Sequence, residues 1–137
     1  MKTSKPSTLV LLTSVLTSAI NGLDKNMHVL DSVTEFDSVD EETNLRLLDK
    51  HKMTIHRLDG LVGLMRNAEH SGERSVRLDP MQMHSVNRAV LEKIAELDKA
   101  MAYFCQMGES EMVVRSFQKQ IEALHMAVFE ANSWVGY

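Results

Sequence analysis

The acidic residues and histidines of this chain include one pair whose spacing could support metal chemistry. Glu122 and His125 stand three residues apart, like the Glu-x-x-His pairs with which helical bundles hold carboxylate-bridged metal pairs. Such a centre uses two of these pairs, whereas this sequence contains one. With 19 acidic residues and 6 histidines in 137 positions, one such spacing is expected by chance. We therefore expect no metal site and no other cofactor.

The remaining reactive side chains do not combine into a catalytic arrangement. No spacing brings a nucleophile and a base onto one helix face beside an oxyanion donor, and there is no glycine-rich phosphate loop. Cys105 is the single cysteine, which excludes an internal disulfide, and its place in a helical heptad predicts a small core residue. The sequence therefore predicts no catalytic residues and no enzymatic activity.

Two glycines fall inside a stretch of sequence that is otherwise helical. Gly60 and Gly63 together cost a helix about 2 kcal/mol relative to alanine, unless the close approach that they allow is used. They share a face that points away from the apolar seam of the same segment. This face consists of His56, Gly60, Gly63, Leu64 and Asn67.

This outward face has two interpretations, and the sequence leaves both open. In the first, a neighbouring helix of the same fold packs closely against the glycines. In the second, the face is a partner-binding surface for a second protein chain, either another copy or a different protein, with Leu61 and Leu64 as flanking apolar contacts.

The segment His56-Arg57-Leu58-Asp59-Gly60 resembles the phospho-accepting motif of histidine phosphotransfer domains, in which an exposed histidine is followed by x-Leu-Lys-Gly. Those domains are four-helix bundles of similar size. The resemblance implies that His56 accepts a phosphoryl group from a receiver-domain aspartate and that Gly60 gives the receiver room. Asp59 stands where the family has lysine, and its carboxylate would repel the phosphohistidine that the lysine stabilises.

These side chains belong to four long segments in which apolar residues recur at three- and four-residue spacing. In none of the segments do apolar and polar residues alternate as they do in a strand. We expect helices over approximately 5–36, 39–69, 80–107 and 109–135. Ser38 and Glu41 form a capping box at the start of the second helix, and Asp79-Pro80-Met81-Gln82 marks the start of the third. Gly108 is suited to end that helix in a left-handed conformation.

These helices predict an all-α fold in a single domain over residues 1–137. The short links near 37–38 and 108 make sequence neighbours antiparallel. The fold is then either an antiparallel four-helix bundle with up-down-up-down topology or a dimer of long helical hairpins, whose four-helix core closes between two chains. The expected core residues, each at the centre of its apolar stripe, are Leu16, Leu23, Leu48, Ile55, Leu58, Val90, Leu97, Phe117, Ile121 and Leu124.

The charge and the N-terminal sequence bear on partners and location. The net charge is −4 and the 15 lysines and arginines are scattered, so we expect no nucleic-acid partner. Residues 1–19 imitate a secretory signal, but the leucine heptad continues unbroken past Ala19 to Leu30, as in one helix. The uninterrupted apolar run is too short to span a membrane, so we expect no membrane partner.

The function that these observations favour is a cytoplasmic, non-enzymatic protein–protein interaction module of the chaperone, adaptor or inhibitor type. We expect a homo-oligomer, in the simplest case a dimer, and a further protein partner whose identity the sequence does not indicate. The first alternative is a histidine phosphotransfer domain with His56 as phospho-acceptor. The second alternative is an exported helical protein with residues 1–19 as its signal.

Overall fold

The computed structural model of the chain describes residues 7–35 and 41–136. Four long helices account for most of this part of the chain, and no strand occurs in it. The helices are α1 (Thr8–Glu35), α2 (Glu41–His70), α3 (Pro80–Gln106) and α4 (Glu111–Ala131), followed by a short 3₁₀ turn, η1 (Asn132–Trp134). The prediction of an all-α fold with four packed helices is confirmed.

The sequence signals around α3 have the structure that they predict. The Asp79 carboxylate accepts a hydrogen bond from the Gln82 backbone N–H at 2.8 Å, and the Gln82 side-chain oxygen accepts one from the Asp79 N–H at 3.0 Å. Pro80 occupies the first turn, where its missing N–H costs nothing. Gly108 follows the helix with a φ of 73°. The predicted capping box at Ser38 and the break at 37–38 lie outside the described residues.

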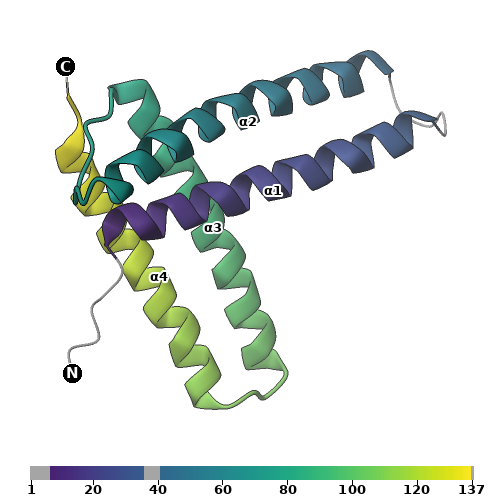
Figure 1. Cartoon of the computed structure of the whole chain (residues 1–137). Helices are drawn as coiled ribbons and strands as arrows, with labels where there is room; N and C mark the ends of the chain where they lie inside the picture. Colours follow the sequence, from purple (N-terminus) through teal and green to yellow (C-terminus); the bar gives the residue numbers. More distant parts are fainter. Residues whose placement is uncertain (1–6, 36–40, 137) are drawn as a thin grey trace.

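The four helices form two pairs that cross each other (Figure 1). α1 packs along α2 and α3 packs along α4, and contacts between the pairs join α1 to α3, α1 to α4 and α2 to α3. The pairs run in different directions away from the crossing, so all four helices come together only near one end of each pair. We call the crossing region the hub. Two parts extend from it. The first arm consists of residues 17–35 of α1 and 41–57 of α2, and the second arm consists of residues 98–106 of α3 and 111–123 of α4, with the turn between them.

The hub contains the hydrophobic core. The buried apolar residues are Leu9, Leu12, Val15, Leu16, Leu58, Leu61, Val62, Met65, Ala68, Leu78, Met83, Val86, Ala89, Val90, Ile94, Leu97, Leu124, Ala127, Ala131 and Trp134. All of them lie outside the two arms. Within the described part of the arms, Asn44 is the only buried residue. Burial of apolar area, and the stability that it provides, is therefore concentrated where the pairs cross.

The crossing explains why half of the expected core is not fully buried. Five of the ten residues are buried as predicted: Leu16, Leu58, Val90, Leu97 and Leu124. The other five lie in the arms and are half-buried. Leu23, Phe117 and Ile121 still pack against the core, whereas Leu48 and Ile55 do not belong to it. Cys105, expected in the core, is exposed near the tip of the second arm for the same reason.

Both ends of the described chain are tied into the hub. The Thr8 hydroxyl donates a hydrogen bond to the Glu130 carboxylate at 2.6 Å. Leu78, in the connection between the two pairs, forms a parallel bridge with Val135: its N–H donates to the Trp134 carbonyl at 3.1 Å, and its carbonyl accepts from the Gly136 N–H at 2.8 Å. These bonds fix the connection between the pairs against the end of the chain.

Candidate functional site

The residues of the predicted outward face of α2 lie at the surface. His56, Gly60, Gly63 and Asn67 are exposed, and Leu64 is 38% exposed. A Cβ atom added at either glycine would meet nothing within 4 Å. No neighbouring helix in the described part of the chain therefore packs against this face. The interpretation of the glycines as an internal packing site is wrong.

Leu61 does not flank the outward face as expected. It is 2% exposed and belongs to the hub. The reason is that α2 packs against α1 and α3 together, which buries a wider arc of its surface than a single seam requires. Leu64 therefore remains as the large apolar side chain on the outward face.

A second surface feature, which the sequence did not indicate, is a cleft between the first arm and α3. It has a volume of about 610 Å³. Its apolar lining comes from Ala19, Leu23, Leu47, Met53, Leu58 and Ala89. Its charged and polar lining comes from Arg46, Asp49, Lys50, His51, Thr54, Arg57, His84, Ser85, Arg88 and Glu92. The cleft exists because α3 crosses the α1–α2 pair near the hub and leaves the rest of the arm uncovered.

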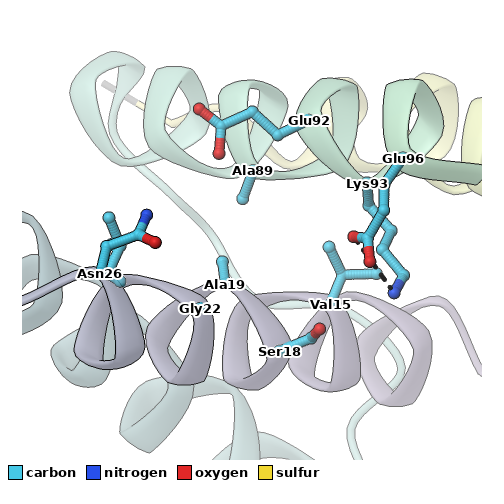
Figure 2. Close-up of a pocket in the computed structure, with 10 residues that line it drawn as sticks. Val15, Ser18, Ala19, Gly22, Asn26, Ala89, Glu92, Lys93 and Glu96 are labelled. Atoms are coloured by element: carbon cyan, nitrogen blue, oxygen red, sulfur yellow. Dashed lines mark ion pairs between the residues drawn. The ribbon is translucent and has the colours of Figure 1, made fainter. Parts of the chain in front are cut away.

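Small residues lie where α1 and α3 cross. Figure 2 shows Ala19 of α1 facing Ala89 of α3, with Gly22 one turn further along α1. A smaller cavity of about 170 Å³ opens beside this crossing, and the ion pair between Lys93 Nζ and Glu96 Oε2, at 3.6 Å, lies at its edge. Both hollows share Ala19, Leu23, Ala89 and Glu92 in their linings, so they adjoin each other at this crossing.

The larger cleft has more positive than negative side chains in a chain whose net charge is −4. Arg46 pairs with Glu42 at 3.2 Å, and Arg88 pairs with Glu92 at 3.7 Å. Lys50 and Arg57 form no ion pair within the described residues. Their charges are therefore available to a carboxylate-bearing partner.

The two surfaces join along α2. Met53, Arg57, Gly60 and Leu64 follow one another at spacings of four, three and four residues, so they share one stripe of the helix. The first two line the cleft and the last two belong to the outward face. Together they place apolar contact area, positive charge and open backbone on one stripe of the helix.

The described residues assemble no metal-binding cluster. No group of three or more His, Cys, Asp or Glu side chains there is placed to hold a metal ion. Glu122 and His125 are both exposed on α4. His56, the residue singled out by the phosphotransfer resemblance, is exposed on α2, and Asp59 is exposed near it.

None of the described helices is long and apolar enough to cross a membrane. Comparison with known proteins does not connect the two surfaces to an established activity. No protein-family model, no curated protein and no solved structure matches this chain.

Proposed function

We propose that this protein is a non-enzymatic protein–protein interaction module of the chaperone, adaptor or inhibitor type, acting in the cytoplasm. Its partner-binding surface is the outward face of α2 that is formed by His56, Gly60, Gly63, Leu64 and Asn67. The observation that carries the proposal is the open space around Gly60 and Gly63.

The stability that α2 loses by having two interior glycines supports this proposal. Two interior glycines cost α2 about 2 kcal/mol relative to alanine, and no contact within the described chain uses the space that they leave. A partner helix or loop can approach the backbone closely there. Leu64 then offers apolar contact area, while His56 and Asn67 offer hydrogen bonds at the border of the contact.

The arms support an association between chains. Apolar seams that are half-buried on both arms are typical of helices that complete their packing with a further helix. We include a homodimer in the proposal for this reason.

The outward face is tested by replacing each glycine with a bulky residue. Gly60→Leu and Gly63→Leu are compared with Ala95→Leu, which adds similar bulk at an exposed position on α3. The tagged proteins are purified from the native host, and their retained partners are quantified by mass spectrometry, with sedimentation equilibrium for self-association. We expect the glycine variants to keep their helicity and to lose at least one association by about tenfold or more, while Ala95→Leu keeps it. Unchanged association in both glycine variants would overturn the proposal.

Phosphotransfer through His56 is the second candidate function, and the exposure of this histidine favours it. An open glycine four residues further along α2 would admit a receiver domain. The experiment incubates the protein with phosphorylated receiver domains from the same host and looks for label that is acid-labile and absent from His56→Gln. Label on His56 supports phosphotransfer, whereas unmodified His56 with every receiver excludes it.

A further inference from the structure

Near the hub, α3 covers one face of the α1–α2 pair. Further along the first arm, the same face is uncovered. Beyond the crossing, this face continues as the cleft described above, in which Leu47 is 37% and Met53 is 65% exposed. The seam between α1 and α2 in the arm is half-buried at Ile20, Leu23, Met27, Leu30, Leu48 and Ile55. Two helices alone bury only the surface that each turns to the other, so one further layer of helices is needed to bury the rest.

Charge is distributed unevenly along this arm. Residues 26–45 contain six acidic residues and no lysine or arginine. The rest of the chain therefore holds 13 acidic residues against 15 basic ones, a balance of +2. The acidic end of the arm includes Asp31 and Glu42, both exposed, while Lys50 and Arg57 lie closer to the hub in the cleft. The arm is thus negative at its far end and positive at its base.

We propose that the cleft is occupied by the first arm of a second copy of this chain. The two arms pack antiparallel about a twofold axis, so that their four helices form one intermolecular four-helix unit. This inference rests on the proposed protein-binding function and specifies one partner, one surface and one orientation. It concerns the cleft side of α2, which adjoins the glycine face along the stripe of Met53, Arg57, Gly60 and Leu64.

Antiparallel packing is the orientation that the charges favour. In a twofold dimer each contact occurs twice, with the roles of the two chains exchanged. The acidic end of each arm then lies against the positive base of the other, which brings Glu42 near Arg57 of the other copy. Parallel packing would place Asp31 and Glu42 of one copy beside the same two acidic residues of the other, which is repulsive. Between these positions Leu47 and Met53 meet the apolar seam of the other arm.

The apolar part of this interface is tested by Met53→Glu in the full-length chain, with Met126→Glu as the matched control. The two methionines are similarly exposed, at 65% and 67%, but Met126 lies on α4 outside the arm. Sedimentation velocity over a range of concentrations should show a wild-type dimer, an unchanged dimer for Met126→Glu, and a dissociation constant raised about a hundredfold for Met53→Glu. The circular dichroism of the folded protein should be unchanged in both variants, because neither side chain is buried within the single chain.

Charge exchange tests the orientation. The base variant carries Lys50→Glu and Arg57→Glu, and the end variant carries Asp31→Lys and Glu42→Lys. For each variant alone, the dissociation constant of the dimer should be about tenfold or more above that of wild type. An equimolar mixture should recover dimers, because one of the two equivalent contacts is then wild type and the other is complementary with both signs reversed. Recovery in the mixture is a result that simple loss of folding would not give.

Two results would overturn the inference. One is a wild-type chain that stays monomeric at about 100 μM, and the other is a dimer that is insensitive to Met53→Glu and to the charge variants. In the second case the arm is not the interface, but self-association stands. The proposed function is judged separately, because loss of a different protein by Gly60→Leu and Gly63→Leu would support it even where either of these results overturns the arm interface.

Discussion

Gly60 and Gly63 stand at exposed positions of α2 where a larger side chain would fit without contact. Alanine has the highest helix propensity and glycine one of the lowest. We therefore predict that Gly60→Ala and Gly63→Ala each raise the free energy of unfolding by about 1 kcal/mol. Urea denaturation followed by circular dichroism measures this change.

The control for this prediction is Gly108→Ala, because Gly108 has a φ of 73°. A Cβ is strained in that conformation, so this variant should lose about 1 kcal/mol where the others gain it. A loss of stability in Gly60→Ala or Gly63→Ala would show that the glycines serve the monomer after all.

Leu16 and Leu23 occupy equivalent heptad positions of α1 but different environments. Leu16 is fully buried in the hub, and Leu23 is half-buried in the first arm. Leu16→Ala should cost about 2 to 5 kcal/mol because it leaves a cavity. Leu23→Ala should cost about half as much or less at concentrations where the chain is monomeric. Thermal melts of both variants check this, and equal losses would contradict the division into hub and arm.

Helix α3 begins with a reciprocal cap and α4 begins without one, which makes the two starts a matched pair. The Asp79 side chain bonds the Gln82 N–H, whereas Ser110, at the N-cap of α4, makes no side-chain cap bond. Asp79→Ala should therefore cost about 1 kcal/mol, and Ser110→Ala should cost less than about 0.5 kcal/mol. Denaturant titration of the two variants measures the difference, and similar losses would show that the cap is not what stabilises the start of α3.

At the scale of elements, the sequence predicts what is local. Helix periodicity and the signals at Asp79 and Gly108 require only a few neighbouring residues, and they indicate the helices and the turn correctly. The crossing of the two pairs brings together residues far apart in the sequence, such as Ala19 and Ala89, which face each other in Figure 2. An apolar stripe has the same period in a hub and in an open arm, so it could not show that Leu23 is half-buried or that a cleft exists.

The candidate site also has one part that the sequence predicts and one part that only the fold reveals. The outward face of α2 follows from helical spacing alone, and its exposure agrees with that geometry. The choice between internal packing and an open surface needed the position of every other helix. The cleft had no sequence signal, because it is lined by three helices that only the fold brings together.

At the scale of the whole molecule, α1 is a main contributor to the core. Leu9, Leu12 and Leu16 are fully buried in the hub. Deletion of residues 1–19 should therefore expose the apolar surfaces of α2, α3 and α4 and cause aggregation. Size-exclusion chromatography with light scattering checks this outcome. Recovery of a soluble, cooperatively folding protein that begins near residue 20 would contradict it and would favour a separable leader.

The hydrogen bond between Thr8 and Glu130 joins residues 122 positions apart, and this has a consequence for synthesis on the ribosome. The segment that follows α3 supplies Ala127, Ala131 and Trp134 to the core around α1. The α1–α2 pair can form early because its two helices are neighbours in the sequence, but its apolar surface at the hub stays uncovered until α4 and η1 have left the ribosome. We expect the nascent chain to need protection from aggregation until then.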